Sequence, residues 1–369
     1  RFALDEVLPL ANELDPRKED IPRPFLDRMG EMGWFGITLP RDVGGLGLGV
    51  FEYCLVAEEL ARAWMSVASI IARAQGMGTQ IGDAARRREL AYRSARGQWI
   101  GAAALSEPGA GSDLANVQCR ATRDGDDWVV HGEKRWCGNA INADFIQLLA
   151  RVRDPEPGER RSAGLASFVV EKERGEFPEG LRGEPIDKVG YHGMTTFHLW
   201  FDGLRVPEAN RLGSGGGSGG SGGERSTFAV TQSGLNVARV HTAARAIGLA
   251  RGALEDSVAY SQERVQFSQP IASFQAIRFK VADMAAEIEA ARALTWQVAQ
   301  AMDDGHSVEK EAAMAKLVAT EMAVRVTGEG IQIHGGNGYT TERQVERYWR
   351  DARLTPIFEG TSEIQRRTI

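Results

Sequence analysis

The sequence predicts an α+β fold in which a helical domain comes first, a β domain follows, and a second helical domain ends the chain. Apolar residues recur at helical spacing before residue 98 and after residue 224, whereas short apolar segments between turn signals fill residues 99–212. A length of 369 residues allows such a division into two or three domains.

Residues 1–98 are predicted as an N-terminal helical domain. Residues 1–14 mix charged and apolar positions, as an amphipathic helix does and a signal peptide does not. Two apolar stripes follow on either side of a glycine-rich turn at residues 44–47: Phe25, Met29, Met32 and Phe35, then Val56, Leu60 and Trp64.

Residues 99–212 are predicted as a middle β domain. Asp124-Gly125 between two apolar segments predicts a β-hairpin, because this dipeptide favours tight turns. The expected strands include Trp99–Ala104, Cys119–Thr122, Trp128–His131, Phe145–Leu149 and Phe168–Val170.

Residues 213–223 contain only glycine and serine and are predicted as a flexible loop. The loop is either an engineered replacement, which we favour, or a natural surface insertion, and it is excluded from functional reasoning. Residues 224–369 are predicted as a C-terminal helical domain, because three apolar stripes indicate long bundled helices over Val240–Val258, Phe274–Val298 and Ala312–Ile333.

The composition excludes several classes of function. With 43% hydrophobic residues, 25% charged residues and a net charge of −6, the chain reads as a globular protein without nucleic-acid binding. No apolar stretch approaches the roughly 20 residues of a membrane span. The three cysteines and six histidines show neither disulfide nor metal-ligand spacing. We therefore expect a cytoplasmic protein without a metal or a membrane partner.

The segment Ile357–Gln365 contains the strongest catalytic candidate. Glu359 lies between Phe358 and Gly360, and such neighbours desolvate a carboxylate and suit it to act as a general base. A glutamate near a helix start also interacts with the helix dipole, so the segment alone leaves both interpretations open.

The segment Leu105–Asp113 follows the first predicted strand and is a candidate ligand loop. Its glycines allow close approach of a ligand, and successive amides can cradle a diphosphate. It lacks the spacing of a Rossmann site or a Walker A loop, and a plain tight turn is the alternative.

Two further candidates lie near predicted helix ends. Arg264 beside Phe267 could bind phosphate and stack on a planar ring, or form a surface ion pair. Gly335 or Gly336 is expected to end its helix in a left-handed conformation, which can also expose backbone amides to a ligand.

Together, four segments resemble the acyl-CoA dehydrogenase family over essentially the whole chain: Ser106–Asp113, Glu263–Gln275, Ile331–Gly338 and Phe358–Thr361. The resemblance implies an FAD enzyme that is usually a dimer of dimers. It also implies a middle β-barrel or sandwich domain and a C-terminal four-helix bundle.

The implied reaction is the α,β-dehydrogenation of a saturated acyl-CoA to the trans-2-enoyl thioester. Glu359 would remove the α proton while the β hydrogen passes as hydride to flavin N5. A backbone N–H near the base and a flavin ribityl hydroxyl would polarise the thioester carbonyl. An electron-transferring flavoprotein would then accept the electrons.

The resemblance also assigns roles to single residues. Those implied to line the flavin and its diphosphate are Leu105, Ser106, Gly111 and Ser112, with Trp136, Cys137 and Gly138 against the isoalloxazine. Those implied to contact the FAD of a partner subunit are Arg264, Phe267, Gln275, Gln332, Gly335 and Gly336, while Thr361 and Glu363 would contact the chain's own FAD. The implied substrate contacts are Ser106, Arg239, Phe358 and Gly360.

Three positions depart from the family pattern. Ala238 stands where some members carry the base, which favours Glu359 for that role. Phe358 replaces a common tyrosine at the acyl pocket. Gly138 replaces a threonine whose hydroxyl lies near flavin N5, which can alter flavin reactivity or the electron acceptor.

Arg239 matches a family arginine near the substrate, and an internal ion pair is its alternative role.

Other functions stay open at this point. Oxygen could replace the flavoprotein as acceptor, and a carrier protein could replace coenzyme A. A non-catalytic flavoprotein with a binding role would show a concentrated basic surface and lack the base, whereas this chain is acidic and contains Glu359. The length and branching of the acyl chain are not predicted.

Overall fold

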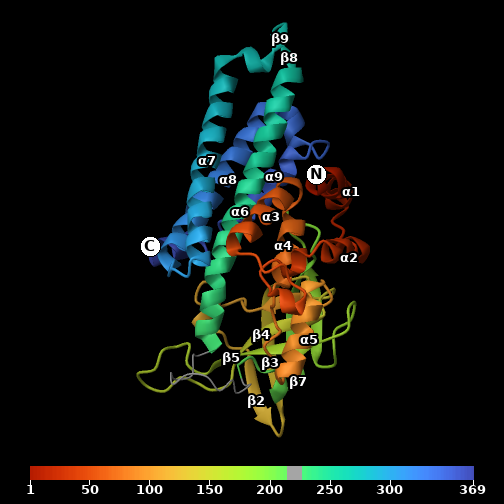
Figure 1. Ribbon diagram of the computed structural model, residues 1–369, viewed down its shortest axis with the longest axis vertical. Helices are drawn as coiled ribbons and strands as arrows, with labels where there is room; N and C mark the ends of the chain where they lie inside the picture. Colours follow the sequence, from red (N-terminus) through yellow and green to blue (C-terminus); the bar gives the residue numbers. More distant parts are fainter. Residues whose placement is uncertain (214–226) are drawn as a thin grey trace.

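The computed structural model describes residues 1–213 and 227–369, with the backbone alone for residues 227–233, and confirms the predicted order of helices, strands and helices (Figure 1). From residue 214 onward, the predicted glycine-serine loop lies outside the described residues. No helix in the described part of the chain is long and apolar enough to cross a membrane.

Short helices form the N-terminal domain. Helix α3 begins at Val50 because a carboxylate from a distant helix caps it: the N–H groups of Val50 and Phe51 donate to Asp303 at 2.7 and 2.9 Å. The helices are α1 (Leu8–Leu14), α2 (Arg23–Glu31), α3 (Val50–Ala63), α4 (Met65–Ile70) and α5 (Ala84–Ala95).

A seven-stranded sheet forms the middle domain, in the order β1-β4-β2-β3-β7-β6 with β5 also paired to β4. Strands β1 and β2 run parallel to β4, and the other pairs are antiparallel. The predicted hairpin is confirmed, since β2 and β3 pair across Gly125, whose φ is 63°. The strands are β1 (Gly101–Ala104), β2 (Arg120–Asp124), β3 (Asp127–Gly138), β4 (Phe145–Arg151), β5 (Leu165–Glu171), β6 (Leu181–Ile186) and β7 (Thr196–Pro207).

Three long helices dominate the C-terminal domain, as the apolar stripes predict. The stripe on α7 is buried at Met284, Ile288, Ala291, Thr295 and Val298. The elements are α6 (Thr227–Glu263), β8 (Val265–Gln266), β9 (Gln269–Pro270), α7 (Gln275–Asp303), α8 (Glu309–His334), α9 (Val345–Leu354) and α10 (Ser362–Thr368).

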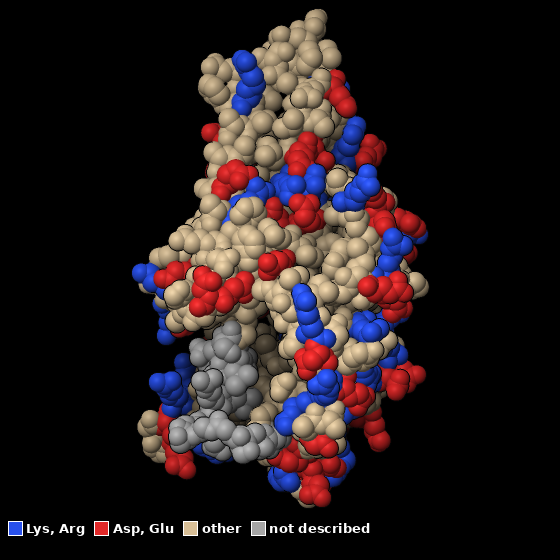
Figure 2. Space-filling model, viewed as in Figure 1, with Lys and Arg blue, Asp and Glu red and all other residues tan. Residues whose placement is uncertain are grey.

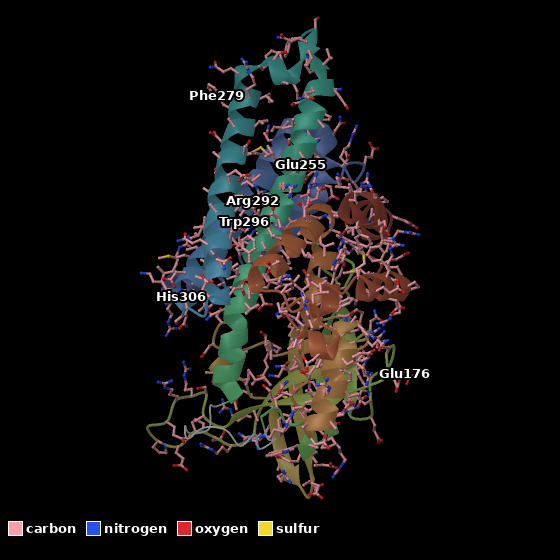
Figure 3. The ribbon with its side chains drawn as sticks, in the orientation of Figure 1. Glu176, Glu255, Phe279, Arg292, Trp296 and His306 are labelled. Carbon is pink, nitrogen blue, oxygen red and sulfur yellow. The ribbon has the colours of Figure 1, made fainter. Side chains whose placement is uncertain are left out.

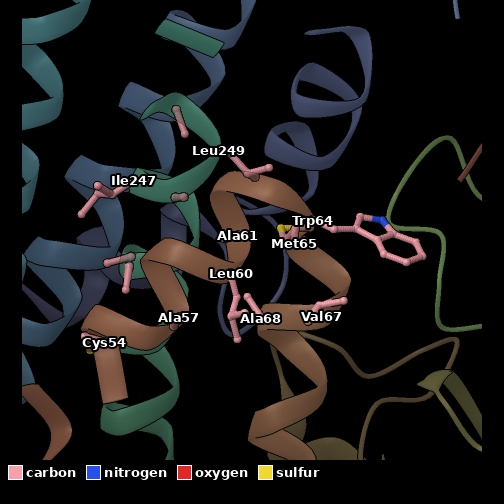
Figure 4. Packing of buried hydrophobic residues seen from close by; sticks show 14 of the residues in the cluster. Cys54, Ala57, Leu60, Ala61, Trp64, Met65, Val67, Ala68, Ile247 and Leu249 are labelled. Carbon is pink, nitrogen blue, oxygen red and sulfur yellow. The ribbon is translucent and has the colours of Figure 1, made fainter. Parts of the chain in front are cut away.

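One hydrophobic cluster runs through both helical domains. Figure 4 shows Leu60 of α3 and Trp64 at its end together with Ile247 and Leu249 of α6. Ion pairs also connect the helices of the two domains: Arg292 of α7 is paired with Glu58 of α3 at 2.9 Å. Arg62 likewise pairs with Glu255 of α6, and Figure 3 labels Arg292 and Glu255. Elsewhere acidic and basic side chains are interspersed over the face in Figure 2.

Helices α3 and α6 approach closely because α6 carries a glycine at the crossing. A Cβ on Gly248 would lie 2.3 Å from the carbonyl oxygen of Glu58. The backbone of α3 cannot move away without opening the shared core, so this position requires the absence of a side chain.

Replacing Gly248 with alanine should therefore destabilise the protein by about 1–3 kcal/mol. Gly328 of α8 is the control, because a Cβ there meets nothing within 4 Å in the described chain. Its replacement with alanine should leave stability unchanged or raise it by up to about 1 kcal/mol. Urea unfolding measures both variants, and equal stabilities would contradict the close packing of α3 on α6.

Candidate active site

Glu359 lies in a tight turn between α9 and α10. Its φ is 54°, and that of Gly360 is 88°. A left-handed conformation costs a non-glycine residue about 1–3 kcal/mol, so the surroundings must hold the turn. Thr361 contributes at one end, where its hydroxyl accepts a hydrogen bond from Ile364 N at 3.3 Å and caps α10. Glu363, in the first turn of α10, is exposed.

Two buried side chains hold the carbonyl oxygen of Gly360. Lys316 Nζ of α8 donates to it at 2.7 Å, and Gln365 Nε2 of α10 donates to it at 2.8 Å. Burial lowers the pKa of Lys316 to about 8, although the nearby charge of Glu359 acts in the opposite direction. The backbone of the turn is thus tied to two helices at one atom.

The Glu359 side chain is exposed, so the chain alone does not supply the desolvation predicted from its neighbours. A bound molecule would have to cover the carboxylate to provide it. Within the described residues, the backbone N–H groups of Glu359 and Gly360 have no acceptor. The turn therefore offers a carboxylate beside two unpaired donors, which suits a ligand with a reactive carbonyl group.

Aromatic and cationic side chains surround Phe358. Its ring lies 6.0 Å from that of Tyr191, and the guanidinium carbon of Arg245 lies 4.8 Å from its centroid. Burial raises the pKa of Tyr53, and the charges of Arg245 and Glu359 also act on this tyrosine. Tyr53 therefore lies near both the turn and Arg245.

Arg239, one of the predicted substrate contacts, is buried on α6. Its Nη1 donates to Asn236 Oδ1 at 3.0 Å, and burial lowers its pKa. No carboxylate forms an ion pair with it in the described part of the chain, so the internal ion pair considered as an alternative is absent there.

A buried ion pair fixes the predicted ligand loop after β1. Lys134 Nζ of β3 donates to Glu107 Oε1 at 2.9 Å and to the carbonyl oxygen of Leu105 at 2.8 Å. Ser106 between them is partly buried, while Gly111 and Ser112 are exposed. Because a Cβ on Gly111 would meet nothing within 4 Å, the loop leaves open space for a ligand.

Trp136 projects from β3 beside this loop. Its side chain is 57% exposed, and its φ of 69° falls where the pairing of β3 with β7 shifts register. Arg135 N donates to the carbonyl oxygen of Ser106 at 2.8 Å, which ties the strand to the loop. An exposed indole next to small residues fits a planar ring system such as a flavin. Cys137 is buried, so only its backbone can face such a ring.

Gly138 leaves room for Arg73. A Cβ on Gly138 would lie 3.3 Å from Arg73 Nη2, so the usual threonine would press on this guanidinium. Within the described residues, no hydrogen bond or ion pair of Arg73 is found, and its charge acts on Tyr53. Gly138 therefore leaves the Arg73 guanidinium without a side chain pressed against it.

The remaining predicted cofactor residues lie at the other end of the molecule. The β8–β9 hairpin lies at one end in Figure 1 and the sheet at the opposite end. Asn337 Nδ2 donates to Tyr260 Oη at 2.9 Å, which places the end of α8 beside the last turns of α6. Gly335 ends α8 with a φ of 58°. The exposed residues of this group are Arg264, Phe267, Gln275, Gln332, Gly335 and Gly336.

Sequence patterns missed several residues that shape the site. Lys134 and Lys316 fall inside a strand and a helical stripe, where a lysine is usually assigned to the exposed face. Arg73 and Arg245 similarly resemble polar positions of amphipathic helices. A charged residue within an otherwise small or apolar segment was the available signal.

All three parts of the chain match the acyl-CoA dehydrogenase family. Residues 1–98 match its N-terminal domain, residues 102–204 its middle domain and residues 227–369 its C-terminal domain.

Individual proteins agree with this assignment. The chain is 39% identical to (2S)-methylsuccinyl-CoA dehydrogenase from Cereibacter sphaeroides, over 100% of this chain and 67% of that protein. Butyryl-CoA dehydrogenase from Megasphaera elsdenii has a TM-score of 0.88 at 33% identity, covering 100% and 94% of the two chains. A chain in the structure of the electron transferring flavoprotein of Acidaminococcus fermentans has a TM-score of 0.88 at 34% identity, covering 100% and 93%. This protein is therefore a member of the acyl-CoA dehydrogenase family of FAD-dependent oxidoreductases.

Proposed function

We propose that this chain dehydrogenates a saturated acyl-CoA between its α and β carbons, with Glu359 as the base. The observation that carries the proposal is the turn itself. It holds a carboxylate next to unpaired N–H donors in a strained conformation that buried side chains stabilise.

The chain's residues account for the proton transfer. An α C–H is a weak acid, so its removal requires polarisation of the thioester carbonyl. The backbone N–H of Glu359 donates to that carbonyl oxygen, and the carboxylate takes the α proton. FAD, when bound, accepts the β hydrogen as a hydride. Substrate and cofactor together would exclude water from the carboxylate, which the chain alone leaves exposed.

We assign the cofactor contacts to two groups of residues. Trp136 and Gly138 would face the flavin, with Leu105, Ser106, Gly111 and Ser112 along its phosphate side, and Thr361 and Glu363 would contact the adenosine portion. The second group lies at the far end of the molecule and would hold the FAD of a second copy: Arg264, Phe267, Gln275, Gln332, Gly335 and Gly336. Such shared contacts support a homo-oligomer, and the dimer of dimers is what the family resemblance implies.

The electron acceptor belongs to the same proposal. The similarity to a chain in an electron transferring flavoprotein structure supports such a flavoprotein as partner. Ser106, Arg239, Phe358 and Gly360 remain the proposed substrate contacts, and a cytoplasmic location remains a prediction.

Replacing Glu359 with glutamine tests the base. An amide cannot accept the α proton, so the rate of flavin bleaching should fall by about 100- to 10,000-fold. The measurement is anaerobic mixing of the FAD-loaded protein with saturated acyl-CoAs, followed by the visible absorbance of the flavin.

Glu321→Gln is the matched control, because Glu321 is a partly exposed glutamate of α8 that pairs with Arg366 at 2.7 Å. It should bleach like the wild type. Undiminished bleaching by Glu359→Gln would exclude Glu359 as the base. If none of the acyl-CoAs bleaches the flavin of the FAD-loaded wild type, the proposed reaction itself is wrong.

Lys316 predicts a pH-dependent contribution to stability. Its pKa is about 8 in the folded chain against an ordinary value of 10.5. Between these values the unfolded chain keeps the proton that the folded chain releases, so the unfolding free energy rises with pH, by about 3 kcal/mol over the whole window. Below pH 8 both states are protonated, and this contribution is constant.

Lys316→Met should lack this rise. Urea unfolding at about pH 7.5 and about pH 9.5 gives the free energy of unfolding of the wild type and the variant at each pH. The slope compared between them is the change of this free energy with pH. Lys310→Met, at an exposed lysine of the same helix, should keep the wild-type slope. Identical slopes for Lys316→Met and the wild type would contradict the burial of a charged amine behind the turn.

A further inference from the structure

Arg245 is a buried cation that the proposed reaction does not use. It lies on α6 and is only 3% exposed. Its Nη1 donates to Ser69 Oγ at 2.6 Å, and its Nη2 donates to Thr242 Oγ1 at 2.7 Å. Both partners are uncharged hydroxyl groups. In the described chain, Nε has no hydrogen-bond acceptor, and no carboxylate forms an ion pair with the guanidinium.

Some arginines of the helical domains are paired with a carboxylate, whereas Arg239 and Arg347 are buried like Arg245 and form no ion pair in the described chain. Arg292 is paired with Glu58 at 2.9 Å, and Arg350 is paired with Asp15 at 2.5 Å. A buried guanidinium without a counter-charge is strongly unfavourable, because desolvation is not repaid by Coulombic attraction. A bound anion can supply the missing counter-charge.

The charged groups around Arg245 increase this imbalance. Lys316 and Arg239 are further cations in the same buried region. The charges of Arg239 and Arg245 both lower the pKa of Lys316. Arg73, against Gly138, is a further cation near Tyr53. The acids that act on these cations are Glu359 and Glu363 near Lys316 and Glu309 near Arg239. Glu359 is required for the α proton in its proposed role as base.

Arg245 also lies beside the residue that precedes the proposed base. Its guanidinium carbon is 4.8 Å from the ring centroid of Phe358, the residue before Glu359. The charges of Arg245 and Glu359 both act on Tyr53, whose ring stacks on His241 at 4.3 Å. The cation is therefore next to Phe358 at the turn of the proposed base and is shielded from solvent.

We propose that Arg245 selects acyl thioesters that carry a second carboxylate at the end of a short acyl chain. This inference rests on the proposed dehydrogenation and specifies its substrate class. The carboxylate supplies the missing counter-charge and accepts a hydrogen bond from Nε. An acyl chain that ends in a methyl group would instead have to bury its apolar end against an unpaired charge.

A purely structural role is the alternative for Arg245. In that case the guanidinium would serve only to connect Ser69 of α4 with Thr242 of α6. A neutral glutamine can bridge hydroxyl groups in the same way, and the two roles therefore predict different effects of that substitution on substrate preference.

The test compares two acyl-CoAs with the same number of acyl carbons, glutaryl-CoA and pentanoyl-CoA. Anaerobic bleaching of the FAD-loaded wild type should be at least about 10-fold faster with glutaryl-CoA at equal subsaturating concentrations. In Arg245→Gln, the ratio of the two rates should fall by about 100-fold. Most of this fall should come from a higher KM for glutaryl-CoA, and the rest from a faster reaction of pentanoyl-CoA. Arg245→Lys should retain part of the preference, because it keeps the charge but not the planar fork.

Arg251→Gln is the control on the same helix. Arg251 is paired with Glu255 at 3.1 Å and with Glu58 of α3 at 3.3 Å, so it already has counter-charges and its loss should leave the ratio of rates unchanged. A wild type that prefers pentanoyl-CoA would overturn the inference while the proposed dehydrogenation stands, and so would an unchanged ratio in Arg245→Gln. If neither thioester bleaches the flavin, and no other acyl-CoA does, the proposed function fails and this inference fails with it.

Discussion

The carbonyl oxygen of Gly360 is the point on which the geometry of the site depends. Lys316 and Gln365 both donate to it, so two helices fix the backbone of one turn. Glu359 adopts a left-handed conformation in this turn, and the carboxylate keeps its position only while the two donors hold. Lys316 is itself buried in the core that joins both helical domains, so the turn is connected to the packing of the whole molecule.

Each part of the chain contributes different residues to the proposed site. The helical domains share one hydrophobic cluster and position the base, its anchors and the cations around Phe358. The sheet has its own core and presents Trp136 and the loop after β1. Tyr53 of α3 belongs to the helical cluster, and the charges of both Glu359 and Arg73 act on it. Glu359 is exposed on the helical side and Trp136 on the sheet side. In the proposed function, the bound substrate and FAD cover both side chains.

Local patterns predicted much of this fold. Stripes at spacings of three and four residues and short apolar segments depend only on neighbouring residues, and they gave the helices and strands in the correct order. The base candidate also came from its immediate neighbours. The desolvation expected for Glu359 was not found, since the side chain is exposed in the described chain. In the proposed function, substrate and cofactor provide it.

The charged residues behind the site could not be predicted in the same way. Lys134 reaches Glu107 across 27 residues, Lys316 reaches Gly360 across 44, and Arg245 reaches Ser69 across 176. Each reads locally as an exposed polar position, and only the tertiary fold buries it. Gly138 was recognised as a departure from the family, but its link to Arg73 also required the fold.

The most direct test of this account is hydrogen exchange at the α carbon of a bound thioester. An acyl-CoA deuterated at both α and β carbons would be incubated in water with protein whose FAD has been chemically reduced, so that hydride transfer is blocked. We expect NMR to show loss of deuterium from the α carbon alone, and no loss with Glu359→Gln. Equal loss with Glu359→Gln and the wild type would show that another group removes the proton, and the turn would not have the role described above.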